Sequence, residues 1–168
     1  MKNPFNNVGV VGAGFLGTQI ALLSANSGYK VTVYDTKASA FDDTYARLTT
    51  DFKNKKINPI IAWEKCDALK KSSAFASEPA VVLKDADLVV EAVFEELELK
   101  RKVFKMSCDN APEKAILASN SSSMPISRFE DSSGRPEKLL HEPGAVGFEA
   151  EGAGGRAGED LDAGEGLA

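Results

Sequence analysis

The stretch VGVVGAGFLGTQIALL, residues 8–23, decides the fold of this chain. An apolar run suited to a buried strand breaks into Gly12, Gly14 and Gly17, spaced G-x-G-x-x-G, and a helical pattern starts at once. Gly12 is expected to turn tightly off the strand, Gly14 to let a pyrophosphate approach the backbone, and Gly17 to let the helix pack closely. The start of the helix offers unpaired N–H groups and the positive end of its dipole to phosphates. The stretch therefore predicts a phosphate-binding turn.

The unit continues with features that specify the ligand further. Gly28 is placed to cap the end of the helix, and KVTVY, residues 30–34, predicts a second strand that ends in Asp35. Asp35 lies roughly 20 residues beyond the glycines, where a carboxylate accepts hydrogen bonds from the adenine ribose. A 2′-phosphate would be repelled there, so the pattern predicts NAD as the cofactor rather than NADP. A glycine-rich turn in some other α/β protein is the alternative.

Composition limits the class of protein. The 168 residues, 43% hydrophobic and 27% charged, are typical of one globular domain. No apolar run is long enough to span a bilayer, and the first residues lack the apolar core of a signal peptide. Cys66 and Cys108 are far apart without metal-ligand spacing, so we expect no metal, a packing role for both, and a cytoplasmic location.

The net charge of −5 is unevenly distributed along the chain. Residues 1–141 sum to +1 and carry no basic stripe suited to nucleic acid, whereas residues 142–168 sum to −6 and hold 8 of the 14 glycines. Gly, Ala, Glu and Asp make up 21 of those last 27 residues, a disordered composition. We therefore expect a nucleotide-binding domain over 1–141 and a disordered tail over 142–168 that is not native domain sequence.

Between the second strand and the next one lies a long helical segment. Residues 38–56 carry apolar side chains at intervals of three or four, Pro59 interrupts, and residues 63–69 resume the helical rhythm. This length predicts an inserted helical pair. Its lysines indicate either a solvated face or a docking surface for a phosphorylated ligand: Lys53, Lys55, Lys56, Lys65, Lys70 and Lys71.

The second half of the chain alternates strands with a helix. Residues 87–93 and 115–119 read as buried parallel strands, and residues 95–108 as a helix with an apolar stripe and a basic face that includes Lys100. Alternating strands and helices predict an α/β fold, a Rossmann-type doubly wound parallel sheet, with ligands at the carboxyl ends of the strands. Three polar sets lie at those ends: Asp35, residues 91–95 and residues 120–123.

Three motifs together carry a family resemblance. GAGFLG, ADLVVEAVFEELELKRKVF and AILASNSSSMPI resemble the NAD-binding domain of the L-3-hydroxyacyl-CoA dehydrogenases, over roughly residues 6–140. The resemblance implies oxidation of the 3-hydroxyl of an acyl-CoA thioester with hydride transfer to NAD. Related dehydrogenases of hydroxy acids such as L-gulonate share these motifs. A non-catalytic NAD(H)-binding protein, as the lens crystallins of this group illustrate, is an alternative of another class.

The resemblance also assigns roles to individual residues. It implies that the three glycines hold the pyrophosphate, Asp35 holds the ribose, and Ala92 lines the nicotinamide side. Glu95 and Lys100 would contact the cofactor or its neighbours, and Asn120 and Ser122 would meet the nicotinamide and the substrate. Ser122 would hydrogen-bond the substrate's hydroxyl or carbonyl oxygen; the alternative is a serine that satisfies its own loop backbone.

The family's reaction also needs a base, a histidine in a His-Phe-Phe-Asn-Pro-like strand end. His141 is the only histidine here, and Pro143 stands where the family's spacing places its histidine. His141 is thus either the catalytic base or an accidental histidine. The family's C-terminal helical domain, which carries the dimer contacts of its homodimeric full-length members, has no counterpart in this sequence. The resemblance therefore implies a C-terminally truncated member.

Overall fold

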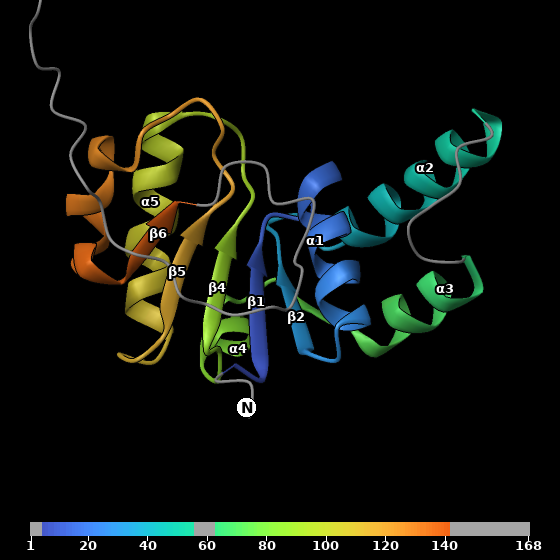
Figure 1. Ribbon diagram of the computed structural model, residues 1–168, viewed down its shortest axis with the longest axis horizontal. Helices are drawn as coiled ribbons and strands as arrows, with labels where there is room; N and C mark the ends of the chain where they lie inside the picture. The colour runs from blue at the N-terminus through green and yellow to red at the C-terminus, as the bar shows by residue number, and fades with distance from the viewer. Residues whose placement is uncertain (1–4, 56–62, 142–168) are drawn as a thin grey trace, which may run out of the picture.

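The computed structural model describes residues 5–55 and 63–141, and within them the chain forms one six-stranded parallel sheet (Figure 1). The strands run in the spatial order β3-β2-β1-β4-β5-β6. This is the order of a doubly wound dinucleotide-binding sheet, and it confirms the predicted Rossmann-type fold. The strands are β1 (Asn7–Val11), β2 (Lys30–Tyr34), β3 (Ala74–Ala76), β4 (Leu88–Glu91), β5 (Ile116–Ser119) and β6 (Leu139–His141).

Helices cover both faces of the sheet, so a separate apolar core lies on each. One core packs β1, β4 and β5 against α4, α5 and Phe129, whose ring stacks on Phe104 at 5.0 Å between centroids. The other packs β1 and β2 against α1 and the start of α2. The helices are α1 (Phe15–Asn26), α2 (Ala40–Asn54), α3 (Trp63–Ser72), α4 (Pro79–Leu83) and α5 (Leu97–Asn110), and three short 3-10 helices, η1 (Ile126–Arg128), η2 (Glu130–Ser133) and η3 (Pro136–Lys138), precede β6.

The inserted helical pair predicted from the sequence is α2 and α3, which project beyond α1 at one end of the sheet (Figure 1). A third apolar cluster of Leu22, Tyr45 and Cys66 ties the pair to α1. Burial raises the pKa of the Cys66 and Cys108 thiols, which fits the expected packing role of both. Among the helices of the described part of the chain, none has both the length and the apolar composition needed to cross a bilayer.

The glycine turn has the geometry that the sequence predicts. Gly12 has a φ of +103°, and a Cβ there would lie 2.6 Å from the carbonyl oxygen of Ala92. A Cβ on Gly17 would lie 1.8 Å from the carbonyl oxygen of Gly12, so α1 packs against the turn as only glycine allows. Gly28 has a φ of +89° just beyond α1, as the predicted C-terminal cap requires.

Some elements were not predicted from the sequence. β3 and β6 have only three residues each, and α4 has five, so none is long enough to show a period. The tail over residues 142–168 lies outside the described residues, so its disorder and the domain boundary at 141 stay predictions.

Asp87 joins the starts of β1 and β4. Its Oδ2 accepts hydrogen bonds from the backbone N–H groups of Asn6 (3.0 Å) and Asn7 (3.1 Å), and Lys114 Nζ lies 3.3 Å from Oδ1. The backbone donors, with Lys114, lower the pKa of the Asp87 carboxyl to about 2. The Asp87 carboxylate is therefore more easily ionised in the folded state than in the unfolded state, and its ionised form stabilises the fold.

The sign of the pH dependence follows from this shift. A depressed folded-state pKa gives stability that is complete above the unfolded pKa, about 3.9, and is lost as pH falls towards 2. We expect Asp87→Asn to remove about 2 kcal/mol of unfolding free energy at pH 7 and to flatten its decline between pH 4 and 2. Urea unfolding across this range measures both effects. Asp109→Asn, in the exposed ion pair with Lys105, is the control and should change stability by less than about 1 kcal/mol.

Candidate functional site

A cavity of about 820 Å³ opens at the carboxyl ends of β1, β2 and β4. It brings together four of the residues singled out in the sequence: Gly12, Gly14, Asp35 and Ala92. Its volume lies within the range of small-molecule and cofactor sites. The switch point of a doubly wound sheet, between β1 and β4, is where such folds bind dinucleotides, and this cavity spans it.

The start of α1 suits a phosphate group. A Cβ on Gly14 would meet nothing within 4 Å, so this position is open to a ligand, unlike Gly12 and Gly17. Gly14 is the N-cap of α1, no side chain caps the helix, and its first turn holds no acidic residue. The positive end of the helix dipole therefore meets no competing carboxylate from the first turn. These features fit a pyrophosphate.

Asp35 lies on the cavity wall at the end of β2 and is half-buried. Its Oδ2 accepts a hydrogen bond from Ala13 N–H (2.8 Å), and its Oδ1 accepts one from Lys37 N–H (2.9 Å). Asp35 thus holds the glycine turn as well as facing the cavity, a contact across 22 residues that no local pattern reveals. The cavity wall also includes Arg47 and Lys102, which sequence reasoning did not single out.

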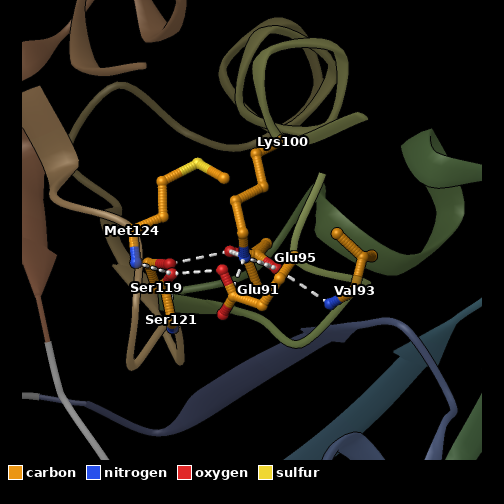
Figure 2. Close-up of polar contacts among 7 residues, drawn as sticks. All are labelled: Glu91, Val93, Glu95, Lys100, Ser119, Ser121 and Met124. Atoms are coloured by element: carbon orange, nitrogen blue, oxygen red, sulfur yellow. Dashed lines mark hydrogen bonds and ion pairs between the residues drawn. The ribbon is translucent and has the colours of Figure 1, made fainter. Parts of the chain in front are cut away.

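Glu91, which directly precedes the cavity-lining Ala92, forms a buried ion pair with Lys100 of α5 (Figure 2). Lys100 on α5 and Glu91 at the end of β4 are each 1% exposed, and Lys100 Nζ lies 3.0 and 2.9 Å from the two Glu91 oxygens. The expectation that Lys100 lies on the basic face of its helix is therefore wrong. Arg101 and Lys105 form that exposed face, whereas Lys100 points inward to neutralise Glu91.

The remaining predicted site residues gather near this ion pair. Glu95 is 39% exposed and its Oε1 lies 3.8 Å from Lys100 Nζ. Asn120 is half-buried and donates its backbone N–H to the Glu91 carbonyl oxygen (2.9 Å). Ser122 is exposed and lines a second cavity of about 370 Å³ with residues 123–126. Within the described part of the chain, the serines that hydrogen-bond the loop backbone are Ser119 and Ser121, not Ser122.

His141 ends β6, and its backbone is paired with Ser119 of β5, next to the serine loop. Its side chain lies outside what the structure describes, so its candidacy as the base stays a prediction. In the helical pair, Lys70 forms an ion pair with Asp42 and lies 5.5 Å from the Tyr45 ring centroid, which gives it a packing role. The other described lysines of the pair, Lys53, Lys55, Lys65 and Lys71, are exposed, and Lys56 lies outside the described residues.

The comparisons with known proteins agree with this geometry. Residues 7–142 match the model of the 3-hydroxyacyl-CoA dehydrogenase, NAD binding domain. The chain belongs to this family. The match confirms the resemblance of the three motifs and supports NAD as the cofactor.

Individual proteins similar to this chain include named dehydrogenases and a diketoreductase. A 3-hydroxybutyryl-CoA dehydrogenase of Bradyrhizobium diazoefficiens is 32% identical over 140 residues, which are 83% of this chain and 47% of that protein. A solved diketoreductase structure is 35% identical with a TM-score of 0.72, covering 83% of this chain and 50% of the other. The 3-hydroxybutyryl-CoA dehydrogenase of Escherichia coli K12 is 26% identical with a TM-score of 0.69, covering 83% and 29%. The chain spans about half the length, or less, of these relatives.

The buried ion pair makes a stability prediction. Lys100→Ala leaves the Glu91 carboxylate buried without its counter-charge, so we expect a loss of about 3–5 kcal/mol of unfolding free energy. Lys105→Ala on the same helix removes only an exposed ion pair with Asp109 and should cost less than about 1 kcal/mol. Urea unfolding of both variants at pH 7 measures the difference. Equal losses would contradict the burial of Lys100.

Proposed function

We propose that this chain is the cofactor-binding part of an NAD-dependent dehydrogenase that oxidises the 3-hydroxyl of an acyl-CoA thioester to a ketone. The observation that carries the proposal is the cavity in which the glycine turn, Asp35 and Ala92 meet at the switch point of the sheet. The family match and the names of the relatives, 3-hydroxybutyryl-CoA dehydrogenases among them, supply the substrate class.

Each part of the site has a role in this proposal. The backbone at Gly14 and the start of α1 hold the pyrophosphate, and Asp35 accepts hydrogen bonds from the adenine ribose. Bound NAD supplies the nicotinamide ring that accepts the hydride. Ser122 donates a hydrogen bond to the substrate's oxygen. A histidine suits the base that takes the substrate's hydroxyl proton, because its pKa lies near working pH, and the assay below tests whether His141, the histidine of this chain, has that role.

We also propose how the protein contacts CoA, where it is located and how it assembles. The exposed lysines of the helical pair are the candidate contacts of the CoA phosphates. Two buried cysteines with raised thiol pKa values are compatible with the reducing cytoplasm that we propose as its location. Since the family resemblance implies homodimers for full-length members, we propose a homodimer for the whole protein.

A pair of glycine variants tests the pyrophosphate site. Gly14→Ala adds a methyl group into open space, so we expect stability to stay within about 1 kcal/mol while NADH affinity falls at least roughly tenfold, since the methyl occupies the place of the phosphates. NADH fluorescence titration and thermal unfolding give the two readouts. Gly17→Ala is the opposite case, because its Cβ would collide with the Gly12 carbonyl and destabilise the fold itself. Unchanged NADH affinity in Gly14→Ala would contradict this placement.

Acetoacetyl-CoA and NADH test the reaction and separate it from a binding-only role. We expect the chain to shift NADH fluorescence and to reduce acetoacetyl-CoA about 10²–10⁴-fold more slowly than the Escherichia coli enzyme, because Pro143 replaces the family's histidine and general acid–base catalysis contributes that much. His141→Ala should leave the residual rate nearly unchanged. Full activity that His141→Ala abolishes would make His141 the base. NADH binding with no oxidation at all would favour the crystallin-like alternative.

A further inference from the structure

The polar residues at the end of β5 alternate in burial. Ser119 and Ser121 are 0% exposed, whereas Asn120 is half-buried and Ser122 is exposed. Side chains alternate in direction from the end of β5, so both buried serines turn towards the carboxylates, Ser119 to Glu91 and Ser121 to Glu95. Ser122 lies in the bend that follows and lines the smaller cavity. Ser119 and Ser121 therefore bind buried or rim carboxylates, whereas Ser122 is accessible to a ligand.

Glu91 anchors the elements around this loop (Figure 2). Its Oε1 accepts a hydrogen bond from Val93 N–H (2.8 Å), and its Oε2 accepts one from Ser119 Oγ (2.7 Å), while Lys100 Nζ donates to both oxygens. One buried carboxylate thus fixes the loop after β4, the end of β5 and the helix α5. A fully hydrogen-bonded buried network of this kind is rigid.

Ser121 extends this network to the exposed edge of the site. Its Oγ donates a hydrogen bond to Glu95 Oε2 (2.7 Å) and accepts one from Met124 N–H (3.3 Å). The second bond closes the turn over residues 121–124 that contains Ser122. The Lys100 ammonium faces two carboxylates, Glu91 at 2.9 Å and Glu95 at 3.8 Å, and the Glu95 side chain, 39% exposed, lies at the rim.

The contacts of Ser121 and Glu95 lie after β4 and β5, at the end of the proposed dinucleotide site opposite Asp35. Gly14 and Asp35 lie at the ends of β1 and β2, and β4 and β5 lie on the other side of β1. A dinucleotide laid across the carboxyl edge with its adenosine at Asp35 therefore brings its nicotinamide riboside to the β4 and β5 loops.

We propose that Ser121 is a positioning residue for the nicotinamide half of the site: its hydroxyl holds the Glu95 carboxylate at the rim and closes the turn that presents Ser122. This inference rests on the proposed function for the identity of the ligand. The adenosine half is independent of Ser121, because the hydrogen bonds of Asp35 to Ala13 and Lys37, and that of Gly14 to Thr18, involve neither Glu95 nor the serine loop.

Binding of two nucleotides, NADH and ADP, tests the two halves of the site separately. NADH contacts both halves, whereas ADP carries the adenosine and the two phosphates but no nicotinamide riboside. We expect Ser121→Ala to weaken NADH binding about tenfold and to leave ADP binding within about twofold of the unmutated chain. Ser121→Thr keeps the hydroxyl and should restore NADH affinity. Isothermal titration of the whole chain with each nucleotide measures these constants.

Ser107→Ala is the matched control. Ser107 on α5 is also a buried serine, 1% exposed, but its Oγ has no hydrogen-bond partner within the described residues. The same chemical change there should alter the affinity for neither nucleotide. If Ser121→Ala weakens ADP and NADH equally, or weakens neither, the positioning role is overturned.

Hydrogen exchange of the Met124 N–H tests the inference without any nucleotide. We expect exchange at least about tenfold faster in Ser121→Ala than in Ser107→Ala, because the acceptor that protects this group is lost. If the unmutated chain binds neither NADH nor ADP, the proposed function fails. The exchange measurement then decides on Ser121 alone: faster exchange supports its hold on the loop, and unchanged exchange overturns it.

Discussion

The close packing of Gly17 against the carbonyl oxygen of Gly12 is the constraint on which the rest of the site depends. With 1.8 Å between that oxygen and the place of a Cβ, only a hydrogen fits. The contact fixes the start of α1 directly beyond β1, so that the helix N-terminus faces the carboxyl edge of the sheet. On its other side Gly12 meets Ala92, which draws the loop after β4 to the same point. The cavity at the carboxyl ends of the strands lies where these two close approaches converge.

The two halves of the site are held by different forces. At Gly14 the site depends on backbone geometry and the helix dipole, with Asp35 securing the turn through Ala13 N–H. At the β4 and β5 loops it depends on buried charge. Removing Glu91 and Lys100 from water is costly, and the hydrogen bonds from Val93 N–H and Ser119 Oγ offset this cost by satisfying the carboxylate. The same network reaches the Ser122 loop, because Ser119 Oγ accepts a hydrogen bond from Ser121 N–H and Ser121 Oγ accepts one from Met124 N–H.

Much of the architecture could be predicted because its signals are local. The glycine spacing, Gly28 as a cap and the apolar rhythm of α2 act over a few residues, and each has the predicted conformation. The short elements β3, α4 and β6 could not be predicted, since three to five residues show no period and these elements are stabilised by their neighbours in the sheet and core. The sequence predicts the wrong side of α5 for Lys100, because a lysine is solvated by default and only the buried Glu91 reverses that preference.

The sequence by itself determined that a strand, a glycine turn and a helix form one unit in a doubly wound sheet, since steric limits on glycine and alternating apolar patterns act along the chain. Only the tertiary structure decided the contacts that complete the site: Asp35 with Ala13, Glu91 with Lys100 and Ser119, and Ser121 with Glu95. The partners in these contacts are 9 to 28 residues apart. They meet because parallel strands bring their carboxyl ends to one edge, and burial there makes each hydrogen bond necessary.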